Sequence, residues 1–294
     1  MHGRAYGIIL VSIATVMWST AGLFVRLLDL DVWSVLGWRS LFGGIVLSLI
    51  SLAGRSRNAE PTPLPLYLVA GFLSAITMFG YVAALKLTTV ANVLAIYATV
   101  PFFAAGAAFV WMRERVDRRV LIASAIALVG VLVVAGFGAR PQDLAGDGLS
   151  LLMTIAFAVF LVMARRHRGL DLAAANAIGS GLCLLLYLPF MPHTLPSAFE
   201  LGVLALFGAT TSGIAYLLFT SGSRYIPAPE AGLIGLLDIV LGPAWVWLAF
   251  DENPGAATLA GGALILASVL WYMWGRLRAG RKPLAAGLRA SDAA

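Results

Sequence analysis

The feature that most constrains this chain is a succession of apolar blocks, each about 20 residues long, joined by short polar connections. A helix of about 20 apolar residues spans the roughly 30 Å of hydrocarbon in a bilayer. One such block could be a buried helix, but ten in succession cannot fit inside one soluble core. The sequence therefore predicts an all-α integral membrane protein whose ten transmembrane helices lie at about 6–27, 33–53, 65–85, 90–112, 119–137, 147–165, 172–191, 198–221, 231–250 and 256–275.

Charge composition supports this interpretation. Only 12% of the residues are charged, about half of the roughly 25% found in soluble domains. A net charge of +6 often indicates nucleic-acid binding, but here the basic residues lie in short loops between apolar blocks, so no nucleic-acid partner is expected. The single Cys183 lies inside an apolar block and supports no disulfide, redox or metal motif. We expect no metal and no cofactor.

The distribution of Lys and Arg among the loops predicts an orientation, because cytoplasmic loops carry an excess of both. If the N-terminus is cytoplasmic, the outer loops carry only Lys86 and Arg140. Arg26 and Arg39 lie within spans, and the other basic residues all fall on the cytoplasmic side. Both termini are therefore predicted to be cytoplasmic, which agrees with an even number of spans.

The two halves of the chain each hold five predicted spans. An odd number means that the second half enters the membrane upside down, which is the arrangement of inverted-repeat transporters. A shift of 138 residues aligns Asn92 with Glu230 and Glu114 with Glu252. The predicted units, arranged around a central cavity, are a first five-helix repeat at 1–141, a second and inverted repeat at 142–276, and a basic cytoplasmic tail at 277–294.

Short motifs within this layout are similar to those of a known family. Trp18 in the first span, Arg39 in the second, and the run that starts as TTVAN at 88–92 and ends at Glu114 resemble the EamA family of the drug/metabolite transporter (DMT) superfamily. The resemblance covers essentially the whole chain. More narrowly, the segment LLDIVLGPAWVW at 236–247 resembles the YddG-type aromatic amino-acid exporters.

One departure from the family pattern concerns the ninth span. Many members have Glu-Pro near the point where this chain has Asp238-Ile239, and Pro243 follows four residues later. This departure favours the YddG-type branch. The resemblance implies export of amino acids and related metabolites across the cytoplasmic (inner) membrane of a bacterium, with both halves of the chain EamA-like.

The leading hypothesis for function is a secondary transporter that works by alternating access, in which the two halves rock about a midplane site. Its expected substrates are aromatic and other neutral or hydrophobic amino acids. Efflux of hydrophobic cationic drugs or of other metabolites is the alternative. Coupling to protons, and a monomer or a weak homodimer, both stay open. An enzyme is not expected, because His2, His167 and His193 lie at a terminus or in loops and no catalytic motif is present; a channel is disfavoured because no filter sequence or charged ring is visible.

Candidate binding residues follow from the cost of placing polar groups at membrane depth. Asp238, near the middle of the ninth span, could hold a substrate ammonium, take up a proton, or be structural. Arg39 could bind a carboxylate or tie one helix to another, and we expect the structural role because an equivalent Arg occurs in EamA proteins of differing substrate. A pocket for an amino acid should be mostly apolar with a few hydrogen-bonding groups; its expected lining is Trp18, Met78, Tyr81, Tyr97, Phe157, Ser212, Tyr216 and Asp238.

Helix interruptions and close approaches are also predicted. Pro101 and Pro243 should interrupt the fourth and ninth spans, either as kinks that line the cavity and act in gating or as plain packing kinks. The small residues at 208–213 could let helices approach closely or expose backbone to a cavity. The fifth and tenth spans, which carry Gly130 and Gly261, are expected to form a supporting or dimer face.

Overall fold

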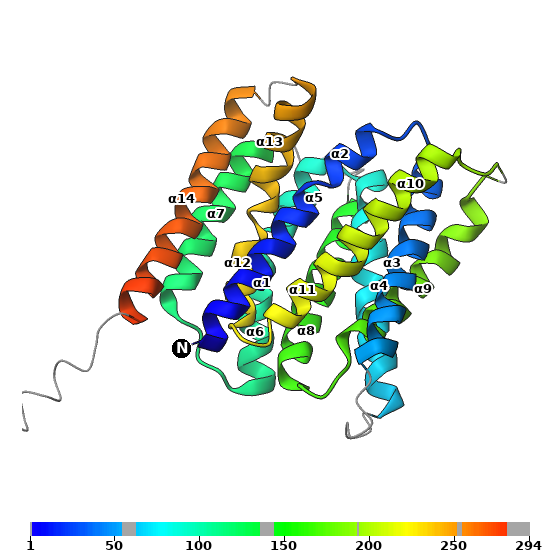
Figure 1. Ribbon diagram of the computed structural model, residues 1–294. Helices are drawn as coiled ribbons and strands as arrows, with labels where there is room; N and C mark the ends of the chain where they lie inside the picture. Colours follow the sequence, from blue (N-terminus) through cyan, green and yellow to red (C-terminus); the bar gives the residue numbers. More distant parts are fainter. Residues whose placement is uncertain (1, 55–62, 136–143, 193, 252–254, 281–294) are drawn as a thin grey trace, which may run out of the picture.

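The computed structural model describes residues 2–54, 63–135, 144–192, 194–251 and 255–280. These ranges fold as a bundle of helices and contain no strand (Figure 1). In chain order the helices are α1 (His2–Ser19), α2 (Ala21–Arg26), α3 (Val32–Gly54), α4 (Leu64–Leu87), α5 (Val90–Tyr97), α6 (Val100–Met112), α7 (Arg118–Ala135), α8 (Leu144–Arg166), α9 (Leu172–Tyr187), η2 (Leu188–Phe190), α10 (Ala198–Phe207), η3 (Gly208–Ala215), α11 (Tyr216–Gly222), α12 (Ala228–Gly235), α13 (Asp238–Phe250) and α14 (Gly255–Gly280).

Nine helical stretches in these ranges are long and apolar enough to cross a membrane. They coincide with all the predicted spans except the fifth. The fifth predicted span corresponds to α7, which packs along α14 (Figure 1). The chain is therefore a multi-span helical membrane protein, and the total of ten spans stays a prediction.

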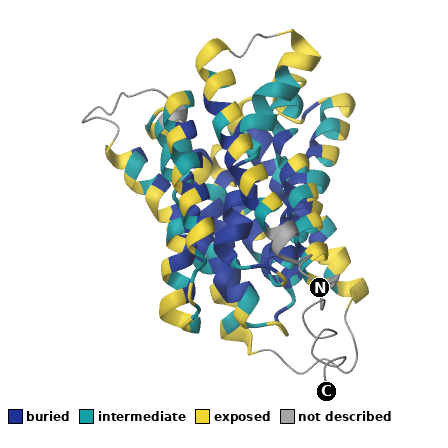
Figure 2. Cartoon of the chain, turned by 90° about the vertical axis from the view of Figure 1, so that its left-hand side faces the viewer, coloured by how far each residue is buried: buried dark blue, intermediate teal, exposed yellow. Residues whose placement is uncertain are grey.

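The surface of the bundle is that of a protein surrounded by lipid. Large apolar side chains point outward, among them Leu52, Val110 and Leu248, which are 66%, 74% and 75% exposed. Figure 2 shows that the buried residues gather in the middle of the bundle, while the outer helix faces are exposed. In water such a surface would cause aggregation, whereas lipid tails cover it in a bilayer.

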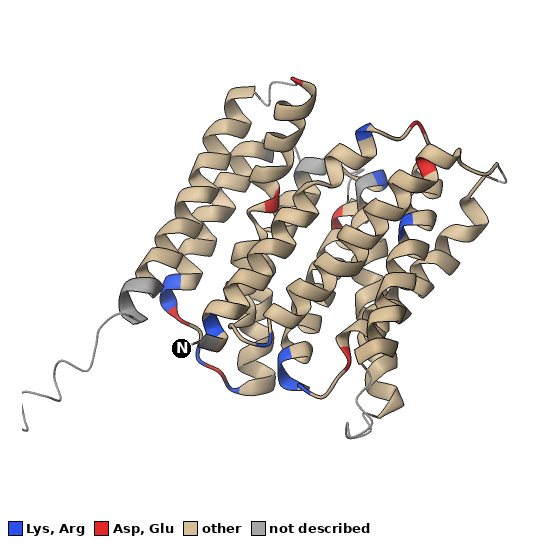
Figure 3. Cartoon of the chain, in the orientation of Figure 1, with Lys and Arg blue, Asp and Glu red and all other residues tan. Residues whose placement is uncertain are grey.

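Lys and Arg gather at the end of the bundle that holds the N-terminus, which we call the N-terminal end; the opposite end is called the far end (Figure 3). Arg4 forms an ion pair with Glu230 there, and Arg165 forms one with Glu114. Glu114 therefore joins the end of α6 to the end of α8. Its predicted counterpart, Glu252, lies outside the described residues.

The fourth and ninth spans are interrupted at equivalent positions. The bounds of α5 and α6 coincide with those of α12 and α13 after a shift of 138 residues. At each break the backbone tightens to i→i−3 bonds: the N–H of Thr99 donates to the carbonyl of Ile96 at 3.0 Å, and that of Leu237 donates to Ile234 at 3.1 Å. The first span is also interrupted, between α1 and α2.

The structure corrects the predicted role of proline in these interruptions. Pro243 lies inside the continuous helix α13, and the ninth span breaks earlier, at Leu236 and Leu237. A single proline removes only one helical hydrogen bond, and α13 continues through that loss. Pro101 follows the break in the fourth span and lies in the first turn of α6, where its missing N–H costs no intrahelical bond.

Small residues set the closest helix contacts. A Cβ added at Gly208 would lie 2.5 Å from the carbonyl oxygen of Arg39, and one added at Gly43 would lie 2.6 Å from the Cβ of Ser212. The close helix approach predicted for 208–213 is therefore confirmed, between η3 and α3. Gly130 and Gly261 likewise bring α7 against α14 within the chain.

The predicted unit boundaries fall at the edge of what the structure describes. The boundary at 141–142 and the tail residues 281–294 lie outside the described ranges. Helix α14 continues to Gly280, so the first residues of the predicted tail belong to the helix.

Candidate functional site

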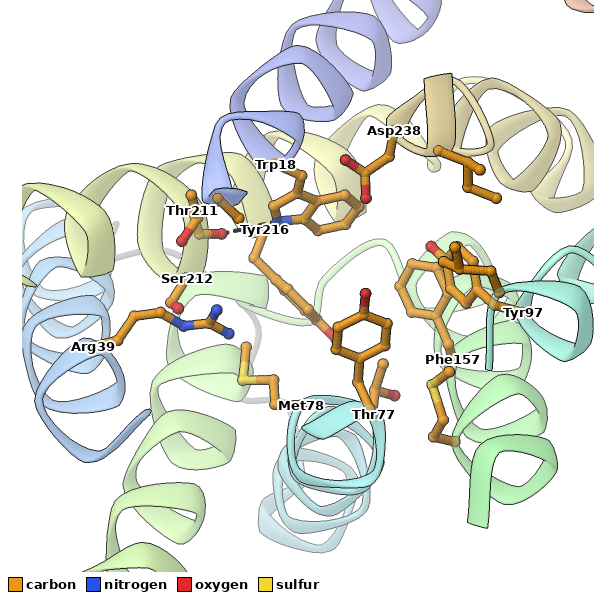
Figure 4. Close-up of a pocket in the computed structure, with 15 residues that line it drawn as sticks. Trp18, Arg39, Thr77, Met78, Tyr97, Phe157, Thr211, Ser212, Tyr216 and Asp238 are labelled. Atoms are coloured by element: carbon orange, nitrogen blue, oxygen red, sulfur yellow. Dashed lines mark hydrogen bonds between the residues drawn. The ribbon is translucent and has the colours of Figure 1, made fainter. Parts of the chain in front are cut away.

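A cavity of about 880 Å³, counting its open mouth, lies in the middle of the bundle (Figure 4). Its lining comes from the first, second, third, fourth, sixth, eighth and ninth predicted spans: Trp18, Ala21, Arg39, Thr77, Met78, Tyr81, Leu94, Tyr97, Met153, Phe157, Thr211, Ser212, Tyr216, Asp238 and Ile239.

The structure brings all eight predicted lining residues to this one cavity, and their part in binding stays a prediction. Pro101 and Pro243 are not among the lining residues. Sequence reasoning had assigned Arg39 to structure and had missed Thr77 and Thr211. Each threonine directly precedes a predicted residue, Thr77 before Met78 and Thr211 before Ser212, and this adjacency is the available signal.

Several local departures from α-helix border this cavity. Trp18 and Ala21 flank the interruption between α1 and α2, and Tyr97 ends α5. Thr211 and Ser212 belong to η3, the π-helical segment of the eighth span. Segments of π-helix occur frequently at functional sites. The cavity therefore lies where regular α-helices are interrupted.

Aromatic rings form one wall of the cavity. The indole N–H of Trp18 donates to the carbonyl oxygen of Thr211 at 2.9 Å. The ring of Trp18 lies 6.3 Å from that of Phe157 and 5.8 Å from that of Tyr216, and Tyr97 stacks on Phe157 at 6.2 Å. Because the backbone already takes its only donor, Trp18 offers a ligand an aromatic surface rather than a hydrogen bond.

The cavity is closed toward the N-terminal end. Below it, Phe160 and Phe219 are 0% exposed and belong to one continuous buried cluster. Toward the far end the lining opens, since Tyr81, in the last turns of α4, is 37% exposed. This gradient places the mouth of the cavity at the far end of the bundle.

Two opposite charges face the cavity from different sides. Figure 4 shows the carboxylate of Asp238 and the guanidinium of Arg39 pointing inward from opposite walls. Asp238 is the first residue of α13, where the positive end of the helix dipole favours a carboxylate. Within the described ranges neither side chain forms an ion pair or a hydrogen bond with another residue.

Three buried polar atoms of residues that line the cavity have no hydrogen-bond partner within the part of the chain that the structure describes: Arg39 Nε, Ser212 Oγ and the Tyr216 hydroxyl. An unsatisfied buried polar group costs about 1–3 kcal/mol. The guanidinium of Arg39 lies 5.0 Å above the ring of Phe207 but has no polar tie to another described helix. The purely structural role expected for Arg39 therefore lacks its expected contacts.

Comparison with known proteins finds a family and relatives that match most of the chain. The sequence matches the EamA-like transporter family twice, over residues 5–136 and 144–274. It is 24% identical over 269 residues to an uncharacterized transporter of Archaeoglobus fulgidus, which covers 90% of this chain and 95% of that protein. It is 22% identical over 280 residues to the pseudopaline exporter CntI of Pseudomonas aeruginosa, covering 90% and 94%.

A solved crystal structure superposes with a TM-score of 0.79 at 21% identity, covering 90% of this chain and 96% of the other. At this identity the likeness concerns the fold alone. The predicted resemblance to the EamA group is confirmed, while the narrower resemblance to YddG-type exporters stays a prediction. Since the two family matches together span most of the chain, this protein belongs to the EamA-like transporter family.

Proposed function

We propose that this protein is a secondary transporter that exports amino acids and related metabolites across the bacterial cytoplasmic membrane by alternating access. Transport of a small molecule across a membrane already follows from the family. The observation that carries the finer proposal is the central cavity, which has aromatic walls, a carboxylate at membrane depth and one closed end.

The lining suits an amino acid with a large apolar side chain. The carboxylate of Asp238 provides a counter-charge for an ammonium group, and aromatic faces also attract cations. The rings of Trp18, Tyr97 and Phe157 provide an apolar surface for the side chain. The relative CntI is named an exporter, which supports the direction of transport.

Helix packing supports the inverted repeat on which alternating access depends. Three contacts join spans that the repeat relates to each other: α3 with α9, α6 with α12, and α7 with α14. Helix α4 packs against α8 and α9, and its counterpart, the eighth span, packs against α1 and α3. If the first and second halves of the chain are exchanged, each of these helix contacts therefore maps onto another contact in the same set. If the N-terminal end is cytoplasmic, the cavity is closed toward the cytoplasm, and this arrangement corresponds to an outward-facing state.

Exchange in liposomes tests this proposal. Purified protein is reconstituted, the vesicles are preloaded with unlabelled Trp, Phe, Met or Thr, and uptake of the labelled amino acid is followed without ATP or an ion gradient. We expect accumulation only in preloaded vesicles and competition among the four. Trp18→Ala should lower the rate at least about tenfold, the effect of losing 1.4 kcal/mol of binding.

The matched control is Trp271→Ala, since Trp271 is 50% exposed on α14 and does not line the cavity. This variant should exchange like the wild type. Absence of exchange by folded wild-type protein, alongside a working exporter, would reject the amino-acid assignment.

Efflux of hydrophobic cations is the second candidate, because Asp238 is a deep carboxylate without a partner among the described residues. On this alternative, Asp238→Asn should abolish resistance to cationic drugs in cells that express the protein. Resistance that survives this change would exclude a cation site at Asp238. The same carboxylate is the candidate for coupling transport to protons.

A further inference from the structure

We infer that Arg39, Ser212 and Tyr216 form a subsite for the carboxylate of the substrate, so that this transporter selects zwitterions over simple cations. The inference rests on the proposed function and specifies its substrate class. It starts from an imbalance in the structure, since the three unsatisfied buried polar atoms of the described residues all belong to residues that line one cavity.

The Nε of the Arg39 guanidinium is buried without a hydrogen-bond partner among the described residues, and such a group requires compensation. Buried charges in proteins are paired or hydrogen-bonded, because their transfer out of water is costly. Phe207 covers one face of Arg39 at 5.0 Å, but an aromatic face cannot accept the in-plane N–H groups of the guanidinium. No described carboxylate forms an ion pair with it. The natural partner is an anion that arrives from the cavity.

The fold holds Ser212 and Arg39 together on one wall, while the hydroxyl of Tyr216 points toward Thr77 (Figure 4). Glycines at 43 and 208 let η3 pack against α3 closely enough to set Ser212 beside Arg39. Figure 4 shows Ser212 next to the guanidinium, on the side of the cavity opposite Asp238. Ser212 is 4% exposed and Tyr216 is 5% exposed. Both residues line the cavity, and neither hydroxyl group has a hydrogen-bond partner among the described residues.

The donor set fits a carboxylate better than a phosphate. The two outer nitrogens of an arginine match the two oxygens of a carboxylate in a bidentate pair. A phosphate dianion would call for further cations, and Arg39 is the only Lys or Arg among the described residues that line the cavity. Across the cavity Asp238 repels an anion and attracts an ammonium. The two walls therefore orient a zwitterion in one direction.

Three indole compounds test the subsite, because they share one ring system and differ in charge. L-tryptophan carries both charged groups, tryptamine lacks the carboxylate, and indole-3-propionate lacks the amine. We measure binding to protein in nanodiscs by scintillation proximity. The wild type should bind tryptophan at least about tenfold more tightly than tryptamine, or 1.4 kcal/mol.

Arg39→Gln should remove this difference between the two ligands, mainly by weakening tryptophan binding. Ser212→Ala should reduce it in part. The control Arg115→Gln changes an arginine near the N-terminal end that does not line the cavity, and should leave the difference intact. Equal weakening of all three ligands by Arg39→Gln would mean that Arg39 serves the fold alone and would overturn the subsite.

A second readout uses the wild-type protein and needs no variant to fold. Phenylglyoxal modifies accessible guanidinium groups, and mass spectrometry of the peptide that holds Arg39 gives its rate of modification. Indole-3-propionate should slow this rate, whereas tryptamine should not. Equal rates with and without indole-3-propionate would overturn the subsite, whatever the exchange assay shows. Protection of Arg39 without amino-acid exchange would reject the exporter proposal and leave the carboxylate subsite in place.

Discussion

Asp238 shows how one residue can carry a charge at membrane depth without a basic partner. It begins α13 directly after the interruption of the ninth span. The positive end of the helix dipole lies at this position and favours a carboxylate. The break in the span thus supplies an environment that an unbroken helix could not give.

Asp238→Asn should separate ligands by their charge. We expect tryptophan binding to weaken at least about tenfold, because the amide keeps the shape but loses the attraction for the ammonium. Binding of indole-3-propionate, which has no ammonium, should stay the same or improve. Asp29→Asn, on the exposed loop before α3, is the control. Equal loss for both ligands would contradict a direct contact between Asp238 and the ammonium.

At the scale of helices, the interrupted spans are held to one another around the cavity. The indole N–H of Trp245 on α13 donates to the hydroxyl of Ser19 at 2.8 Å, at the point where the first span is interrupted. The N–H of Leu23 closes the next turn on the carbonyl of Thr20 at 3.0 Å. Freed backbone groups thus find partners inside the bundle, as a lipid environment requires.

The contact between α3 and η3 makes a prediction about two glycines of the eighth span. Gly208→Ala should destabilise the protein by about 1–3 kcal/mol, the usual cost of overpacking, since the new Cβ would lie 2.5 Å from the carbonyl oxygen of Arg39. Gly202→Ala, where a Cβ meets nothing within 4 Å, should be neutral or stabilising. Thermal unfolding followed by size-exclusion chromatography compares the two. Similar midpoints would argue against the close contact.

At the scale of the whole molecule, the two ends of the bundle differ at positions that the predicted repeat makes equivalent. At the N-terminal end Arg224 donates to the carbonyl of Ala164 at 3.1 Å and to that of Leu170, and so joins the turn after α11 to the end of α8. Its counterpart at the far end is Lys86, whose ammonium lies 4.6 Å above the ring of Trp33. The side chain at the N-terminal end is therefore held by hydrogen bonds to two carbonyls, whereas its counterpart at the far end makes a cation–π contact.

Arg224→Gln should weaken these hydrogen bonds at the N-terminal end and expose the closed half of the pathway. The reporter is a cysteine at Ala231, a position on α12 that is 0% exposed. In inside-out vesicles, labelling of this cysteine by an impermeant maleimide should rise several-fold, as expected when two charge-assisted hydrogen bonds are lost. Lys86→Gln is the matched control and should not raise it. An equal rise in both variants would mean that the whole bundle loosens and that Arg224 does not specifically hold the N-terminal end closed.

Much of the fold could be predicted from the sequence, because lipid leaves the backbone few options. Every buried N–H and C=O must be satisfied internally, so apolar blocks of sufficient length become helices. The same constraint predicts the cavity lining. A polar side chain deep in an apolar span, such as that of Tyr97 or Asp238, avoids lipid by facing the interior that the helices share. These predictions depend on local composition and on the thickness of the bilayer.

What the sequence by itself determined, then, is a set of membrane-spanning helices and the family to which they belong. Only the tertiary structure decided where the ninth span breaks, at Leu236 and Leu237 instead of Pro243, and that Arg39 meets Ser212 without a carboxylate beside it. The tertiary structure also decided which end of the bundle is closed. These features depend on which helices pack together, and such contacts join residues far apart in the chain whose pairing no local pattern specifies.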